Sequence, residues 1–173
     1  MDKFFTFLFL IVIFNNVTAQ DNLDVFDVAR KGTIEEVKVI FKKNPNSINA
    51  LNSEGYSPLV LATYRGNNEV AKFLIENGSD INGNSKMGTP LMAAIVKGNT
   101  EIAKLLIEKK ANVNSSDANG TTALMYAVQF KNSDILKLLL IHNADKTKID
   151  NQGKTAFEFA VFSKNEEIIN LLK

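Results

Sequence analysis

The sequence predicts an all-α solenoid of about five helix-turn-helix repeats, joined by tips that form β-turns or hairpins. A helix-start pattern, in which Ser or Thr precedes Pro or Ala and then a large apolar residue, recurs about every 33 residues. Its copies begin at Ser57, Thr89, Thr122 and Thr155. Two apolar stretches with helical spacing follow each copy, and exit turns end near Asn82, Asn114 and Thr147. Because one such unit cannot bury its own apolar face, neighbouring units must stack.

The clearest unit spans residues 88–114. Thr89 can cap a helix by accepting a backbone N–H, and Pro90 fits the first helical turn. Gly98 ends this short helix, because glycine adopts the left-handed cap conformation without a steric penalty. A second helix is predicted to start near Asn99. Its apolar face consists of Ile102, Leu105 and Leu106.

The period, the helix pair and the exit turn together resemble the ankyrin repeat family. The resemblance implies one ankyrin repeat domain over residues 20–173. Its repeats are expected at about 22–49, 50–82, 83–114, 115–147 and 148–173.

The two terminal repeats are expected to differ from the inner ones, because each has one side in water. The first lacks the Thr-Pro-Leu start, and its exit over residues 44–49 is longer than the others. Polar residues predict a polar cap on the last repeat: Lys164, Glu166, Glu167, Asn170 and Lys173. A core ladder is predicted from one large apolar residue in each start pattern: Leu59, Leu91, Leu124 and Phe157.

The tips carry the positions at which the repeats differ most. The resemblance implies that Asp117 and Asp150 brace their turns through backbone hydrogen bonds, with Asn52 and Asn84 in the same role. Repeat three is expected to lose one residue between Asn82 and Asn84, and Met87 to replace the turn glycine found at Gly55, Gly120 and Gly153. Lys131 replaces the glycine between the two helices of repeat four.

The first residues do not belong to the repeats. Lys3 and the terminal amine precede an apolar run over residues 4–14, and small residues lead up to Ala19. This order predicts a secretory signal peptide over residues 1–19, cleaved between Ala19 and Gln20. The alternatives are a membrane anchor and a buried helix. The run is shorter than the ~20 apolar residues of a spanning helix, so we expect no membrane insertion after cleavage and a periplasmic or secreted protein of bacterial source.

Composition excludes several classes of function. The chain has no Cys, one His and a formal net charge of +1. Thiolate metal sites, disulfides and thiol catalysis are therefore excluded, and the near-neutral charge argues against nucleic acid as a partner. His142 is interpreted as a residue at a helix C-terminus. No nucleophile–base pair, metal-ligand cluster or phosphate-binding loop is evident, so we expect no enzyme activity, no metal and no cofactor.

In the ankyrin pattern, the exposed variable positions are the turn tips and two residues near the end of each first helix. The resemblance thus implies a partner-binding set: Tyr56, Tyr64, Arg65, Val96, Lys97, Gln129, Phe130 and Phe162. Each helix-end pair holds one apolar residue, which predicts an apolar groove flanked by Arg65 and Lys97. The alternative is that these side chains pack against the neighbouring repeat or under the turns.

The resemblance implies a module that binds one protein partner, and the predicted signal peptide adds export; we expect a monomer. Other hypotheses remain open at this point. The chain is alternatively an accessory, protective or immunity factor for an exported enzyme or toxin, for example an oxidative-stress enzyme, or a secreted effector directed at a host.

Overall fold

Ten α-helices and one 3-10 helix build the repeats in residues 23–173, which are the residues described by the computed structural model. Their bounds are α2 Val25–Lys31, α3 Ile34–Lys43, η1 Pro45–Asn49, α4 Pro58–Arg65, α5 Asn68–Glu76, α6 Pro90–Lys97, α7 Thr100–Glu108, α8 Ala123–Gln129, α9 Ser133–Ile141, α10 Ala156–Ser163 and α11 Glu166–Leu172. The predicted signal peptide over residues 1–19 and the cleavage site between Ala19 and Gln20 lie outside the described residues.

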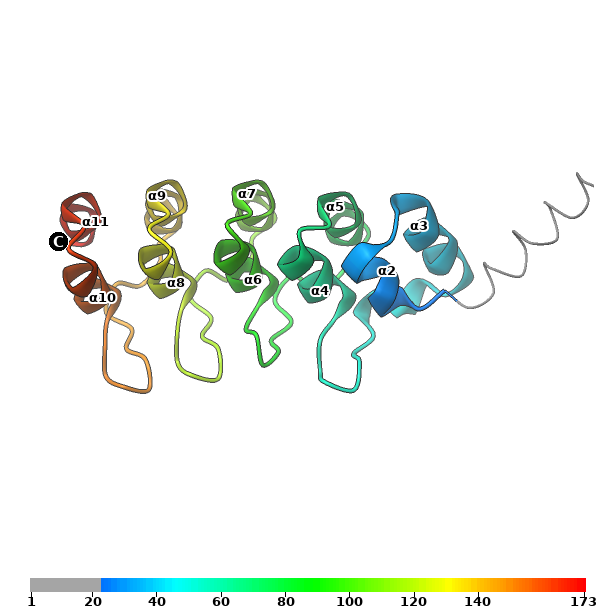
Figure 1. Cartoon of the computed structure of the whole chain (residues 1–173), viewed down its shortest axis with the longest axis horizontal. Coiled ribbons are helices and arrows are strands. Elements are labelled where there is room, and N and C mark those ends of the chain that lie inside the picture. The colour runs from blue at the N-terminus through cyan, green and yellow to red at the C-terminus, as the bar shows by residue number, and fades with distance from the viewer. Residues whose placement is uncertain (1–22) are drawn as a thin grey trace, which may run out of the picture.

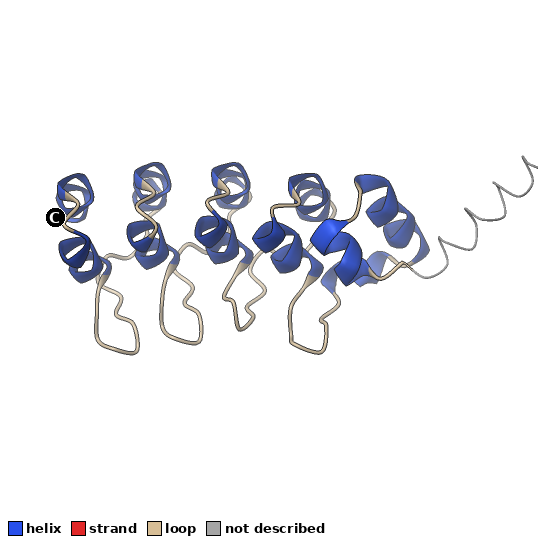
Figure 2. Cartoon of the chain, viewed as in Figure 1, coloured by secondary structure: helices blue, strands red, loops and turns tan. Residues whose placement is uncertain are grey.

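The helices stack in two rows, and this arrangement confirms the predicted all-α solenoid (Figure 1). The first helix of each repeat lies in one row, made of α2, α4, α6, α8 and α10, which we call the inner helices. The second helices form the outer row. Long loops project from the inner row, between helices of successive repeats (Figure 2). Consecutive inner helices pack on one another, as expected of repeats that bury a shared core.

The helix ends form as the sequence predicts. Thr89 Oγ1 accepts the backbone N–H of Met92 at 3.4 Å, and Pro90 occupies the first turn of α6. Gly98 caps the C-terminus of α6 in the left-handed conformation, with a φ of 71°. Asn99 Oδ1 then accepts the N–H of Ile102 at 3.2 Å and starts α7. The short inner helices are thus held at both ends by local hydrogen bonds.

The core ladder is confirmed for three of its four residues. Leu59 is fully buried, and Leu91 and Leu124 are 1% exposed. The fourth prediction is wrong, because the side chain of Phe157 is 37% exposed. Each leucine is covered by the following repeat, whereas no described repeat follows α10.

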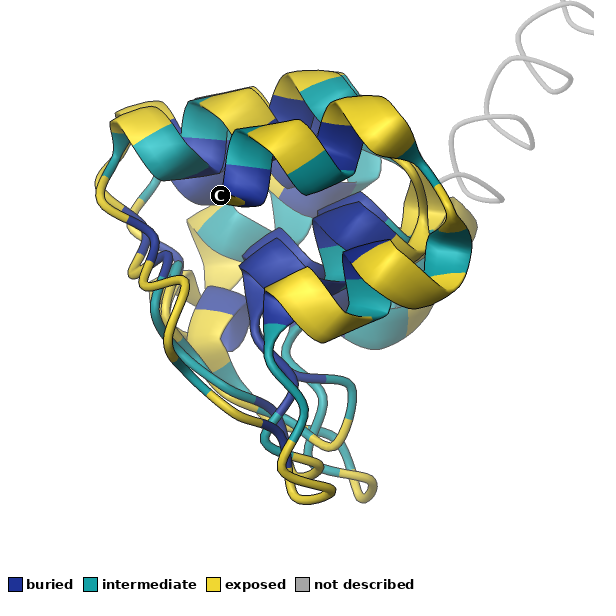
Figure 3. Cartoon of the chain, turned by 90° about the vertical axis from the view of Figure 1, so that its left-hand side faces the viewer, coloured by how far each residue is buried: buried dark blue, intermediate teal, exposed yellow. Residues whose placement is uncertain are grey.

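The polar residues predicted to cap the last repeat are exposed, but the inner helix of that repeat is not polar. Those polar residues lie on α11 and on the turn before it, whereas α10 carries exposed apolar residues. Exposed residues are yellow in Figure 3, which views the solenoid from its C-terminal end. Val161 is 48% exposed and Phe162 is 72% exposed. Position 161 corresponds to the buried residues Ile95 and Val128 of earlier repeats, so this repeat keeps the core pattern at a position that no described residue covers.

Asparagine side chains join successive repeats at the exit turns. Asn49 Oδ1 accepts the backbone N–H of Asp80 at 2.8 Å, and Asn82 Oδ1 accepts that of Asn112 at 2.8 Å. Asn114 Oδ1 continues the series with the N–H of Asp145 at 2.7 Å. These bonds fix the spacing of the tips along the solenoid.

Three tips form as predicted. Asp117 Oδ1 accepts the backbone N–H groups of Asn119 and Thr121, at 2.8 and 2.9 Å. Asp150 makes the equivalent bonds in repeat five, and Asn52 makes them in repeat two. Antiparallel bridges close the hairpins at Ser116–Thr122 and Ile149–Thr155. The carboxylates are therefore structural braces.

The tip of repeat three differs from the prediction. The missing residue is lost from the tip itself, since the turn closes between Ser85 and Gly88. Gly88, with a φ of 77°, supplies the left-handed residue, so Met87 does not replace the turn glycine. Ser85 Oγ accepts the N–H of Met87 at 3.2 Å and takes the bracing role, while the amide of Asn84 donates to the carbonyl of Ser116 in the next repeat.

Candidate protein-binding face

Most of the side chains predicted to contact a partner are exposed at the ends of the inner helices. Tyr64 is 37% exposed, Phe130 is 50% exposed and Phe162 is 72% exposed. Arg65, Lys97 and Gln129 are also exposed, whereas Val96 is half-buried. We call the surface formed by α4, α6, α8, α10 and their hairpin tips the inner face. The helix-end residues of four repeats thus lie on one side of the solenoid (Figure 1).

The exposed apolar residues occupy two neighbouring helix positions. Tyr64, Val96 and Phe162 stand at the same position of their repeats, whereas Phe130 stands one residue later. The polar partners in the last two repeats are Gln129 and Ser163, and Ser163 Oγ donates to the carbonyl of Ala160 within α10. The apolar surface is therefore staggered.

Tyr56 has a different environment from the other seven predicted residues. It is half-buried, packs against the core, and its N–H donates to Asn52 Oδ1 at 2.8 Å. These contacts give Tyr56 a structural role in its tip.

Aromatic side chains gather on α8 and α10. The ring of Tyr126 lies 6.4 Å from that of Phe130, centroid to centroid. Lys154 Nζ reaches back from its hairpin and lies 5.9 Å from the ring centre of Phe159 and 5.5 Å from that of Phe162. Such cation–ring contacts are attractive and hold the lysine against the aromatic surface.

Sequence reasoning did not group Tyr126, Phe159 and Lys154 with the binding residues. The signal available was their position: 126 and 159 precede the predicted helix-end pairs by one helical turn and therefore share a face with them. The approach of Lys154 depends on the fold of the hairpin.

Asp117 links this cluster to its tip. The hydroxyl of Tyr126 donates to Asp117 Oδ2 at 2.7 Å, while Oδ1 of the same carboxylate braces the turn. Burial, followed by the hydrogen bond to Asp117, raises the pKa of the Tyr126 phenol to about 12. The phenol is therefore neutral at physiological pH and remains a hydrogen-bond donor.

A cavity of about 420 Å³ lies between the tips of repeats four and five, beside the aromatic cluster. Its walls are mainly amides, hydroxyls and rings, from Asn119, Thr121, Tyr126, Gln129, Asp150, Asn151, Gln152 and Phe159. Amides both donate and accept hydrogen bonds, as a peptide backbone requires of its partner.

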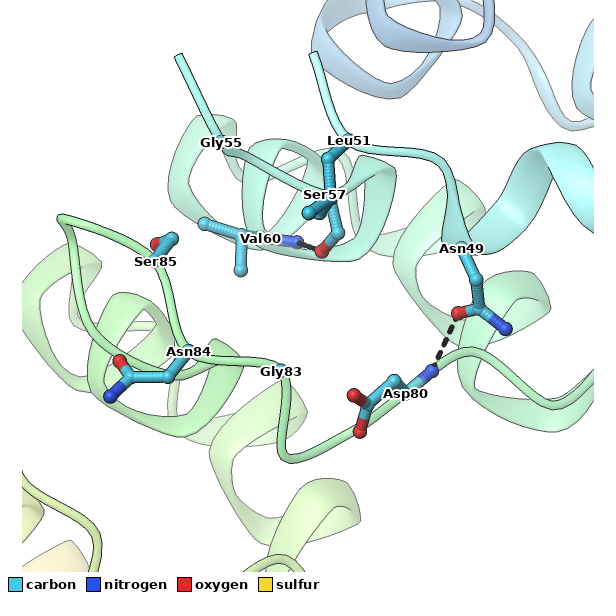
Figure 4. A pocket seen from close by; sticks show the side chains of 9 residues that line it. All are labelled: Asn49, Leu51, Gly55, Ser57, Val60, Asp80, Gly83, Asn84 and Ser85. Carbon is cyan, nitrogen blue, oxygen red and sulfur yellow. Dashed lines mark hydrogen bonds between the residues drawn. The ribbon is translucent and has the colours of Figure 1, made fainter. Parts of the chain in front are cut away.

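A second cavity, of about 290 Å³, lies between the tips of repeats two and three (Figure 4). Asn49 and Asp80 line one side of it and are joined by the inter-repeat hydrogen bond. Leu51 lies at its edge and is 66% exposed. Its lining has no aromatic side chain, so it offers less to an apolar partner than the cavity beside Tyr126.

The described residues contain no group of three or more His, Asp or Glu side chains that could hold a metal ion. His142 caps the C-terminus of α9, as interpreted, and lines neither of the two cavities above. Between residues 23 and 173, each helix is too short or too polar to cross a membrane.

Comparison with known proteins identifies the repeat type. The family model described as "Ankyrin repeats (3 copies)" matches residues 25–117, 82–150 and 112–173. These overlapping matches extend over both rows of helices and over every tip.

Individual relatives match a shorter stretch. BTB/POZ domain-containing protein 3 of Schizosaccharomyces pombe is 40% identical over 60 residues, which are 35% of this chain and 12% of that protein. Ankyrin repeat and SAM domain-containing protein 6 of Rattus norvegicus is 34% identical over 59 residues, covering 34% of this chain and 7% of the relative. DNA-binding protein RFXANK of Homo sapiens is 32% identical over 60 residues, covering 35% and 23%. The matched part is a small fraction of each relative, so the similarity concerns the repeats.

Proposed function

The chain belongs to the ankyrin repeat family, and from this premise we propose that it is a non-catalytic module that binds one protein partner through its inner face. The repeats of this family generally mediate protein–protein interaction. The proposed contact residues are those at the ends of the inner helices, with Tyr56 of one tip at the edge: Tyr64, Arg65, Val96, Lys97, Gln129, Phe130, Phe162 and Tyr56.

The exposure of aromatic rings on the inner helices carries the proposal. Phe130 and Phe162 leave half or more of their surface in water, although Val128 and Ala160, two residues before each of them, are fully buried. Burying apolar surface is favourable, and large aromatic residues often dominate the energy of protein interfaces. A partner that covers these rings gains that energy without any rearrangement of the core.

Export forms the second part of the proposal. The signal peptide over residues 1–19 directs a monomeric mature chain, starting at Gln20, to the periplasm or out of the cell. Intact mass of the exported protein tests this part. A mass starting at Gln20 supports it, and full-length chain recovered only from the cytosol contradicts it.

We also propose that the module needs no metal or cofactor and has nucleic acid neither as partner nor as substrate. The support is the family, together with a sequence that offers no nucleophile–base pair. Stoichiometric metal in the purified protein, or turnover that survives repurification, contradicts this part.

Substitution of the exposed rings tests the binding face. Tyr64→Ser and Phe130→Ser, separately and together, should abolish capture of the partner from a periplasmic extract. Both should leave the melting temperature nearly unchanged. Ile141→Ser is a matched control, because Ile141 is 74% exposed on the outer helix α9. Equal capture by all variants contradicts the proposal, and a large fall in melting temperature would assign the rings to the core.

A further inference from the structure

The inner face is chemically uneven along the solenoid. Its aromatic surface is concentrated on α8 and α10, where Tyr126, Phe130, Phe159 and Phe162 lie with Lys154. In repeats two and three the corresponding positions hold one ring, that of Tyr64. A large apolar side chain of a partner therefore finds most contact at the C-terminal half of the inner face.

Cations stand at the end of every inner helix from α4 to α10. Arg65 and Lys97 are the last residues of α4 and α6, and Lys131 and Lys164 follow α8 and α10 closely. All four side chains are exposed, and within residues 23–173 none of them forms an ion pair.

Two cations on the outer helices form ion pairs with acidic residues of the next repeat. Lys72 lies 2.8 Å from Glu101 of the next repeat, and Lys137 lies 2.9 Å from Glu167. Two outer-row cations, Lys72 and Lys137, are thus paired with acidic residues, whereas the four cations at the inner helix ends have no such partner among the described residues, and the inner helix α10 also exposes Glu158. The net charge of +1 does not reveal this difference in pairing between the two rows.

A cation at a helix C-terminus also stabilises its own helix. That role explains one cation at each helix end, but it does not concern Lys154, which lies in a hairpin. Glu158 lies nearby, and hydrogen bonds from Thr155, with a smaller contribution from the charge of Lys154, lower the pKa of its carboxyl. Lys154 Nζ itself donates to Gln152 Oε1 at 3.1 Å and forms no direct ion pair with a described residue. Its charge is thus held directly over the rings of Phe159 and Phe162.

We propose that the C-terminal half of the inner face binds an extended acidic segment of the partner that carries one large apolar side chain. The inference rests on the proposed function, since it names the chemistry of the partner for that same face. The apolar side chain covers Phe130 and Phe162, and a neighbouring carboxylate pairs with Lys154. Further acidic residues lie along the cations at the helix ends, and the amides of Asn119 and Gln152 bind the backbone of the segment.

A nucleic acid would also meet cations and rings here, but the lining of the cavity favours a peptide. That lining carries the side-chain amides of Asn119, Gln129, Asn151 and Gln152. These amides match the donors and acceptors of a peptide backbone.

Fluorescence anisotropy with defined peptides tests the inference. The probe is a labelled peptide of alternating Glu and Ser with one central Phe, added to the mature chain. We expect binding that weakens at high salt, because exposed charges are screened. Replacing Phe by Ser, or Glu by Lys, in the peptide should weaken binding about tenfold or more. A labelled single-stranded oligonucleotide serves as the competing ligand.

Protein variants locate the contact. Phe130→Ser and Lys154→Met should each weaken binding of the acidic peptide, while the melting temperature shows that the fold is kept. Lys104→Met is the matched control, because it removes the same charge from an exposed position on α7. No binding of the acidic peptide, an equal effect of Lys104→Met, or preferential binding of the oligonucleotide would each overturn the inference. If Phe130→Ser loses the natural partner while the acidic peptide fails to bind, the inference falls and the proposed function stands.

Discussion

The hydroxyl of Tyr126 donates a 2.7 Å hydrogen bond to Oδ2 of Asp117, the residue that braces the tip of repeat four. The bond ties the inner helix α8 to its own hairpin. In repeat five the corresponding pair is Phe159 and Asp150, which has no hydroxyl to make the bond. Asp150 nevertheless holds its tip through two backbone N–H groups at 2.8 and 2.9 Å.

Tyr126→Phe should therefore destabilise the chain without unfolding the tip. The variant loses one hydrogen bond to a carboxylate, and a cost of about 1 kcal/mol is expected at a half-buried site. Phe159 shows that a phenylalanine ring is accepted at this position. Urea unfolding followed by circular dichroism measures the difference. A variant as stable as the natural chain would show that the bond contributes nothing.

The same pair predicts a loss of stability at high pH. The pKa of the Tyr126 phenol is raised to about 12 in the folded chain, above the value of about 10 of a free tyrosine. Its contribution is fully present below pH 10 and is lost as the pH rises through about 12, because the unfolded chain releases the proton first. The difference in stability between the natural chain and Tyr126→Phe should therefore shrink over this range. A difference independent of pH would contradict the assignment.

The buried hydroxyl of Thr63 should lower the stability of the folded chain. Its side chain is fully buried on α4, and Oγ1 has no hydrogen-bond partner among the described residues. The corresponding residues Ile95 and Val128 are apolar. Thr63→Val should raise stability by about 1 kcal/mol, because a buried hydroxyl without a partner is unfavourable. Thermal and urea unfolding check this; a loss of stability would indicate that the hydroxyl is satisfied in solution.

Leu124 and Phe157 occupy the same repeat position but differ in burial. Leu124 is 1% exposed, so Leu124→Ala should cost ~2–5 kcal/mol through lost burial and a new cavity. Phe157 is 37% exposed, and Phe157→Ala should cost distinctly less. Urea unfolding of the two variants gives the comparison. Equal costs would mean that the side of α10 that faces away from α8 is covered in solution.

Sequence reasoning succeeded where local chemistry decides the structure. Thr89 and Gly98 mark the ends of a helix through the hydrogen bonds that they make within a few residues. The repeat period then predicts the same kind of helix in the other repeats. The leucine ladder follows, because stacked identical units place identical positions in contact.

The errors arise where the described residues supply no covering neighbour or where a loop is shortened. Phe157 obeys the repeat pattern, but its burial depends on a covering repeat that the pattern alone does not supply. In repeat three, aligning the repeats does not decide where the missing residue is lost. The backbone hydrogen bonds between Ser85 and Gly88 show that the tip is one residue shorter. Lys154 meets Phe162 only because the hairpin folds back against α10.

Hydrogen exchange of the mature chain, with and without its captured protein partner, tests the central claim most directly. Slower exchange reports backbone protection, and binding at the inner face should protect the tips and inner helices of repeats four and five, over residues 119–131 and 150–164. The outer helices α7 and α9 should exchange as they do in the free chain. Protection confined to α7 and α9, with the inner face unchanged, would contradict the account.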